Sequence, residues 1–248
     1  MIVPMEISKI VLLESNLQPF HSVEKFAVDN QIIALFDVSK NNVEGNSIVF
    51  HEKYGIFTDA RSTKQIMNEL YEVNGWGFAM AKFLMNYFGI THHTPFINNC
   101  FAYMPMTGAS RRNTDWIAIH FIELYQIETK KILFITKQGN KIWLEFPRGD
   151  FEKRIHDVCL LIQASIKVFE VFLKQGGCQL HYPPEQLFLI YSKCRCKAHN
   201  KLRLLEDLEM VCRLIIKFLL DNQGIESLGK EETEKFYLQN LERTKKLY

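Results

Sequence analysis

The sequence lacks the hydrophobic segments that membrane insertion and secretion require. Its longest apolar stretch, Leu214 to Leu220, is interrupted by Lys217 and is far shorter than the roughly 20 residues that span a bilayer. The first residues, Met1 to Glu6, show no basic region followed by an apolar one, so we expect no signal peptide. We therefore expect a soluble, cytoplasmic protein with no membrane partner.

The chain also has little net charge, +2 at pH 7, but its basic residues are unevenly distributed. Residues 100–154 contain more Lys and Arg than Asp and Glu. Residues 186–203 contain basic side chains and no acidic one. Two basic zones on an otherwise balanced chain are typical of contact with a polyanion. For the second zone a merely solvated surface is an equal alternative.

Six cysteines in 248 residues, without a secretion signal, indicate reduced thiols rather than a disulfide framework. Internal repeats and low-complexity linkers are also lacking. A chain of this length can form one large domain or two small ones.

The first part of the chain is predicted to be β-rich, because short apolar runs alternate with turn residues. Gly139 lies in a tight hairpin predicted at 137–140, and the dipeptide at 29–30 predicts another turn. The predicted strands are 7–13, 26–28, 32–38, 47–51, 55–58, 101–104, 116–124, 131–136 and 141–146.

Helical periodicity appears twice. Ser62 and Gln65 form a predicted capping box for a helix that continues over 66–71 and resumes at 78–88 before Gly89. Asp150 is a predicted N-cap for an apolar helix over 155–173, which Gly176 and Gly177 end. Further helices are predicted at 204–220 and 230–245.

The fold class expected is α+β. A β-rich N-terminal half with short antiparallel hairpins and an inserted helical segment is followed by a helical C-terminal half. The predicted boundary divides residues 1–149 from residues 150–248.

The stretch from 90 to 147 contains a distinctive order of short motifs. It has ITHHTPF at 90–96, FAYMPMTGASRR at 101–112, DWI at 115–117 and a glycine hairpin at 137–141. This order resembles the central block of the ComK family of competence transcription factors. That family shows an Ile-Ser-His segment near prolines, an apolar-Pro strand, a Ser/Thr-rich loop with one arginine, and a Trp-Ile strand.

The resemblance implies a DNA-binding transcription activator that switches on DNA-uptake genes. It implies double-stranded A/T-rich boxes as the ligand, assembly as a homo-oligomer, and contacts with RNA polymerase and an adaptor-protease system. It places the family's loop arginine on Arg111. The sequence departs from the family at 77–82, where GFAMAK lacks the arginine of a Gly-Arg-Lys step. Phosphate contacts must then come from other residues, or binding is weaker.

An arginine on a β-loop can enter the narrow minor groove of A/T-rich DNA, where the potential is most negative. Neighbouring hydroxyls and cations can hold phosphates and fix the register. The predicted DNA-binding residues are Thr107, Ser110, Arg111 and Arg112 in the loop, with Lys137, Lys141, Arg148, Lys193, Arg195 and Lys197 as further phosphate contacts.

Cysteines and histidines near the C-terminal basic zone raise the alternative of a metal site. Cys178-x2-His181 is followed by Cys194-x-Cys196-x2-His199, and thiolate with imidazole can bind zinc. The Cys-x-Cys spacing is tighter than the usual Cys-x2-Cys, and the resemblance implies no metal. We therefore expect neither a metal nor another cofactor.

An enzyme is the rival class. The sequence has no Gly-x-Ser-x-Gly, no phosphate-binding glycine loop and no His-Glu-x-x-His. Cys100 lies near His92 and His93 in sequence, and His120 lies on a predicted strand, so a Cys/His hydrolase is one alternative. A degenerate relative that acts only through protein partners is another. We expect a protein that is not an enzyme.

Overall fold

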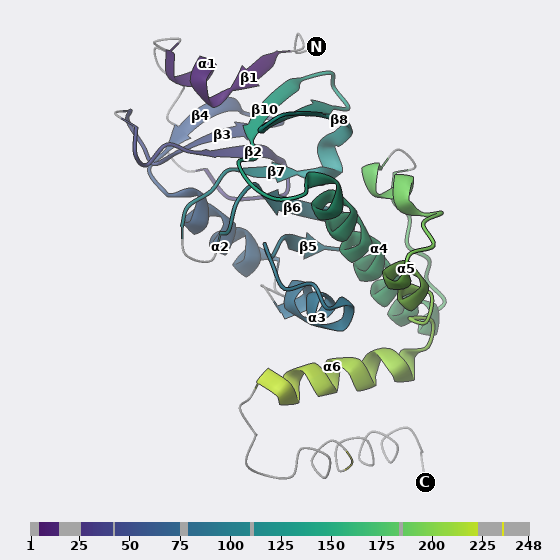
Figure 1. The fold of residues 1–248 in the computed structure, drawn as a ribbon. Coiled ribbons are helices and arrows are strands. Elements are labelled where there is room, and N and C mark those ends of the chain that lie inside the picture. The colour runs from purple at the N-terminus through teal and green to yellow at the C-terminus, as the bar shows by residue number, and fades with distance from the viewer. Residues whose placement is uncertain are drawn as a thin grey trace.

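The computed structural model describes residues 5–14, 26–41, 43–74, 79–109, 112–183, 186–222 and 235, and it confirms the α+β class (Figure 1). Two sheets precede the long helix α4. The strands are β1 Glu6–Ser8, β2 Ile32–Asp37, β3 Ser47–His51, β4 Gly55–Asp59, β5 Phe96–Asn98, β6 Phe101–Pro105, β7 Trp116–Ala118, β8 Ile122–Glu128, β9 Lys131–Thr136 and β10 Lys141–Glu145. The helices are α1 Lys9–Glu14, α2 Thr63–Val73, α3 Ala79–Phe88, α4 Phe151–Gln175, α5 Lys197–Leu202 and α6 Leu208–Asn222, with 3₁₀ turns η1 Ile119–Phe121 and η2 Leu187–Tyr191.

The six-stranded sheet has the order β4-β3-β2-β7-β6-β5 and is antiparallel throughout. The predicted strands 47–51 and 55–58 are confirmed and form the hairpin of β3 and β4, with Ser47 opposite Asp59 and His51 opposite Gly55. All five residues of β3 are buried, because helices and loops cover both faces of this strand.

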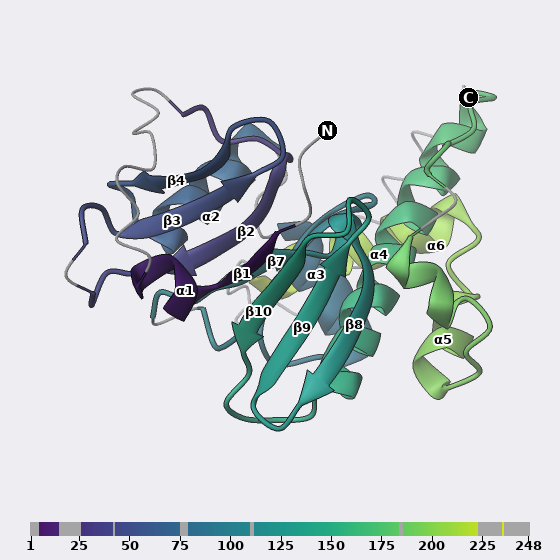
Figure 2. The same cartoon turned by 90° about the horizontal axis from the view of Figure 1, so that it is seen from above.

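The four-stranded sheet has the order β1-β10-β9-β8. The predicted hairpin of β9 and β10 is confirmed, and Gly139 has the positive φ (82°) that the tight turn needs. β1 pairs in parallel with β10, so the start of the chain completes a sheet built more than 130 residues later. Figure 2 shows the two sheets beside each other, with α4 on the far side of β8 from β10.

Three predicted strands are wrong in part. Residues 7–13 contain only the end of β1, because the Ser8 hydroxyl accepts the Val11 N–H (3.2 Å) and the chain turns into α1. Phe26 and Val28 are buried but have no strand partner. The predicted strand 116–124 is broken by η1, where the chain leaves the six-stranded sheet and enters the four-stranded one.

The predicted N-caps of two helices are confirmed. Ser62 and Gln65 form both bonds of the capping box at α2, and the Asp150 carboxylate accepts the Lys153 N–H (3.0 Å) at α4. α4 begins at Phe151, four residues before the prediction, and ends at Gly176 as expected. α6 begins later than predicted, at Leu208, because turns occupy 203–206 and the Asp207 carboxylate accepts the Glu209 N–H.

The buried apolar residues of both predicted regions form one hydrophobic cluster. α4 supplies twelve buried residues and packs against β5 and β6, so it joins the sheets to the C-terminal elements. The predicted helix 230–245 lies outside the described residues except for Lys235. Among the described helices, none combines the length and apolarity needed to cross a bilayer.

Candidate functional site

The loop 106–115 connects β6 to β7 and is closed at its base by its own polar groups. The Met106 N–H donates to the Asp115 carbonyl (2.9 Å). The Thr107 N–H donates to the Thr114 hydroxyl (3.0 Å), and the two threonine hydroxyls bond each other (2.8 Å). Ordering a loop costs conformational entropy, and these bonds hold the two sides of the loop together before any ligand arrives.

Asp115 ties the base of this loop to two other elements. Its carboxylate accepts the Asp37 N–H at the end of β2 (2.7 Å) and pairs with the Lys9 ammonium of α1 (2.7 Å). Burial raises the pKa of Asp115, while Lys9 opposes that rise. The loop is therefore anchored to the end of β2 by a hydrogen bond and to α1 by a partly buried ion pair.

Arg154 and His93 lie at the base of the loop. The Arg154 guanidinium donates to the carbonyls of Pro105 and Met106 (3.2 Å each) and lies 4.7 Å from the Phe146 ring centre. Burial lowers the pKa of Arg154 to about 10. His93 lines a hollow beside the loop, and burial is the main cause of its lowered pKa, followed by the charge of Arg154.

A hollow of about 440 Å³ lies between this loop, the segment before β5 and helices α2 and α3. Its described lining includes Lys64 and Lys82, both exposed, and contains no acidic residue. The hydroxyl residues Thr91 and Thr94 face the same space, together with the loop residues Gly108 and Ala109. A second hollow of about 450 Å³ lies beyond His93 and has a mixed lining with Asp150 and Asp157.

The predicted loop residues are only partly described. Thr107 is half-buried and its hydroxyl is used by Thr114, so it braces the loop rather than facing a ligand. Arg112 is exposed, whereas Ser110 and Arg111 lie outside the described residues. Arg148 is exposed beside Gly149, which lines the second hollow with His92 and His93. We call this region, residues 89–95, 106–115 and 148–149, the loop end.

Lys137 and Lys141 are not brought to the loop end. The Lys137 N–H donates to the Phe121 carbonyl, just after the far end of β7, and the Lys141 N–H donates to Met5. The loop leaves β6 after Pro105 and enters β7 at Trp116, at the other end of both strands. The structure thus separates these two lysines from the loop by the length of the strands.

Lys193, Arg195 and Lys197 are exposed and form a third group. They belong to the stretch that packs against the first half of α4. Arg154, which faces the loop, and His156, which faces this stretch, are two residues apart in the helix. Two residues correspond to about 200° around a helix, so the two basic regions lie on nearly opposite faces of α4.

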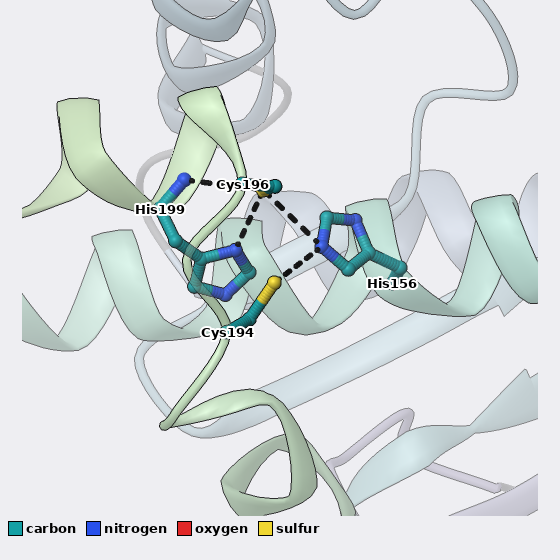
Figure 3. A group of neighbouring side chains, drawn as sticks. All are labelled: His156, Cys194, Cys196 and His199. Atoms are coloured by element: carbon teal, nitrogen blue, oxygen red, sulfur yellow. Dashed lines mark hydrogen bonds between the residues drawn. The ribbon is translucent and has the colours of Figure 1, made fainter.

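Four possible metal ligands meet beside α4 (Figure 3). The Sγ atoms of Cys194 and Cys196 each lie 3.6 Å from His156 Nε2, and Cys196 Sγ lies 3.3 Å from His199 Nδ1. All four ligand atoms lie within 4.8 Å of one another. Cys194, Cys196 and His199 were candidates from sequence; His156 was not, because it lies 38 residues before Cys194.

The other half of the sequence-derived Cys/His set is not in this group. Cys178 is exposed, with its thiol near the Gly176 carbonyl, and His181 is exposed as well. Neither belongs to the cluster of described ligands.

The Cys/His pair considered for catalysis has poor geometry for nucleophilic attack. His120 Nε2 lies 3.1 Å from the Asn30 carbonyl, and Nδ1 lies 3.3 Å from both the amide and the carbonyl of Ala102. Burial raises the pKa of the Cys100 thiol, which disfavours the reactive thiolate. His120 is thus occupied by backbone groups and Cys100 is held as a thiol.

No family model, curated protein or solved structure matches this chain. The resemblance of residues 90–147 to the ComK family stays a prediction. The arrangement at the loop end is what supports a function.

Proposed function

We propose that this protein is a cytoplasmic transcription activator that binds A/T-rich double-stranded DNA through the loop end, as the ComK-like motifs imply. The observation that carries the proposal is the basic hollow there. Residues from two segments that the resemblance selects line it, Thr91, His93 and Thr94 from one and Gly108 and Ala109 from the other, with Lys82 from the region where the family's Gly-Arg-Lys step falls. Motifs that are separate in sequence thus form one surface.

The chemistry of this surface suits a phosphate backbone. Lys64 and Lys82 supply positive charge, Thr91 and Thr94 supply hydroxyl donors, and no acidic residue among the described lining opposes them. Most protein–DNA hydrogen bonds go to phosphates and sugars and set the register of the complex. Lys64 and Lys82 also offer the charge that the missing arginine at 77–82 would have supplied.

The described residues of the loop suit contact with the minor groove. Its near side consists of small residues, Thr107-Gly108-Ala109, and a Cβ built on Gly108 would meet nothing within 4 Å. Arg112 is exposed on its far side. A narrow loop with arginine can enter the minor groove of A/T-rich DNA, where sequence is read through groove width and potential.

The bracing of the loop favours recognition without rearrangement. Arg154 and the Thr107–Thr114 pair hold the loop at its base. A site whose supporting groups are already locked loses less entropy on binding.

Lys193, Arg195 and Lys197 are proposed as a separate phosphate-binding group, because they lie across α4 from the loop. Lys137 and Lys141 lie at the opposite end of the strands, so we do not include them in the surface that meets the same stretch of duplex. Assembly into a homo-oligomer is also proposed, since Phe172, Ile190 and Leu204 are large apolar side chains exposed in the C-terminal half.

The test is binding to A/T-rich and G/C-rich duplexes of equal length, measured by fluorescence anisotropy at several salt concentrations. Six or more phosphate contacts predict a fall in affinity of at least about 10³-fold between ~50 and ~200 mM salt. Dissociation constants that are flat over this range, or equal for the two duplexes, would count against the proposal.

Two variants distinguish sequence reading by the loop from phosphate binding by the C-terminal basic group. Arg111→Ala should weaken binding to the A/T-rich duplex by about 1–3 kcal/mol and leave non-specific binding almost unchanged. Lys193→Ala with Arg195→Ala should weaken both duplexes alike and reduce the salt slope. Thermal melting of each variant shows that the fold is intact. If Arg111→Ala binds like wild type, the assignment of the reading arginine is wrong.

A further inference from the structure

The cluster of His156, Cys194, Cys196 and His199 has the composition and the spacing of a metal site. A tetrahedral zinc ion with bonds of about 2.3 Å to sulfur and about 2.05 Å to nitrogen places its sulfur and nitrogen ligands about 3.6 Å apart. Both sulfur distances to His156 Nε2 equal 3.6 Å, and that between Cys196 Sγ and His199 Nδ1 is 3.3 Å.

The orientation of the four side chains also favours a metal site. Figure 3 shows His156, on α4, and His199, on α5, with the two cysteines between them. His156 directs Nε2 at both sulfurs while its Nδ1 lies 3.4 Å from the Asp157 carboxylate. A carboxylate on the second ring nitrogen is the usual way in which a metal-binding histidine is held in its tautomer.

Without a metal, the cluster is poorly satisfied. Thiols are weak hydrogen-bond donors and acceptors. Their hydrogen bonds therefore offset little of the free energy that is lost when two imidazoles and two sulfurs are removed from water and brought together. His199 is only 2% exposed, and its Nε2 has no hydrogen-bond partner among the described residues. Its other nitrogen, Nδ1, contacts the weak partner Cys196 Sγ, and a metal bond would replace this weak contact.

The composition of the cluster matches the charge of a zinc ion. A metal binds cysteine as the thiolate and histidine as the neutral imidazole. Two thiolates and two neutral imidazoles then balance the charge of one divalent zinc ion.

We infer that His156, Cys194, Cys196 and His199 form a structural zinc site. Four protein ligands fill a tetrahedral ion, which leaves no open position for a substrate. Three ligands come from the stretch after η2 and the fourth comes from α4, so the ion clamps residues 191–205 onto that helix. This inference does not rest on DNA binding, and its test measures the metal.

The first experiment measures the metal content of full-length, untagged protein purified without chelators, by mass spectrometry of the elements. We expect about one zinc per chain. Cys194→Ser with Cys196→Ser should reduce this at least about tenfold. The matched control is Cys178→Ser with His181→Asn, which changes an exposed Cys and His outside the cluster and should retain the zinc.

A second measurement covers the case in which the double cysteine variant does not fold. Wild-type protein loaded with Co²⁺ should show the visible bands of a tetrahedral ion and the charge-transfer absorption of bound thiolates. His156→Ala, a change at a half-exposed position, should alter the tetrahedral bands and keep the thiolate absorption.

Several outcomes would overturn the site. Wild-type protein that contains no zinc and does not compete for it with a chromophoric chelator of about micromolar affinity lacks the proposed ion. Zinc that stays in the Cys194/Cys196 variant, or leaves with Cys178 and His181, belongs to other residues. A Co²⁺ complex without thiolate absorption excludes the two cysteines as ligands.

Discussion

The loop 106–115 and the segment 191–205 both present exposed cations, but different contacts hold them. The loop is the continuation of two paired strands, and three other elements donate hydrogen bonds or a charge to its base. The segment consists of short turns and a six-residue helix. Its polar links to the rest, such as that from the Tyr87 hydroxyl to the Lys201 carbonyl, lie at the surface.

Surface pairs contribute little stability, so the segment needs another anchor and the loop does not. The structure offers two kinds of anchor, the buried side chains of Leu202 and Leu205 and the Cys/His cluster. A loop between paired strands is held in place by their backbone hydrogen bonds, whereas a region outside a sheet is held in place by a few side chains. A substitution in one region, with the other region as the reference, separates the two kinds of anchor.

The largest effect should follow removal of zinc. At a free zinc concentration about a thousand times its dissociation constant, the ion adds about 4 kcal/mol to the free energy of unfolding. A chelator should therefore lower stability in urea titrations and speed hydrogen exchange in 191–205. Exchange in 106–115 should stay unchanged. Equal acceleration in both regions would show that the ion supports the whole fold and not this segment.

Arg154→Met should be the next largest effect, in the opposite region. It leaves the carbonyls of Pro105 and Met106 without their donor, and unpaired polar groups of this kind cost about 2 kcal/mol. Lys153→Met, an exposed neighbour, should change stability by less than about 0.5 kcal/mol. Zinc content should be the same in both variants; a loss in Arg154→Met would mean that the two faces of α4 are coupled.

A smaller effect is expected from the lysines of the basic hollow. Lys64→Ala with Lys82→Ala should reduce the slope of log affinity for DNA against log salt by about two, one for each phosphate that is no longer neutralised. Lys137→Ala, at the other end of the strands, should leave the slope unchanged. A slope that responds to Lys137 and not to the pair would move the DNA surface to the four-stranded sheet.

The smallest effect concerns pH at His93. Burial lowers the pKa of His93 in the folded protein, so between that value and about 6.5 the unfolded chain binds more protons. Stability should therefore fall as the pH drops below about 6.5. His93→Gln should make unfolding free energy less dependent on pH in that range, measured in chelator-treated samples so that metal release does not contribute. An unchanged pH dependence would mean that His93 is not the titrating group.

Local signals in the sequence predicted the local structure well. The capping box at Ser62, the cap at Asp150 and the turn at Gly139 each depend on bonds within four residues, and all three are confirmed. Contacts between distant residues were not predictable in this way. Nothing near His156 marks it as a partner of Cys194, because α4 and the turns after η2 must first pack together.

The same limit explains the error at the N-terminus and the separation of Lys137 from the loop. Residues 7–13 are apolar enough for a strand, but pairing with β10 uses only three residues before α1 begins. Lys137 is basic and close in sequence to the ComK-like block, yet strand direction carries it away from the loop. The Cys-x-Cys-x2-His spacing marked three of the four clustered side chains, whereas His156 is distant from them in sequence.

The parallel pairing of β1 with β10 also has a consequence for synthesis of the protein. Glu6 is paired with Lys141, 135 residues later in the chain. At about 5–20 residues per second, the ribosome needs roughly 7–27 s to make that partner after β1 is complete. During this time the apolar side chain of Ile7, which is buried in the folded protein, has no strand to cover it. The N-terminal strand is therefore the first strand to be synthesised and among the last to pair with its neighbour.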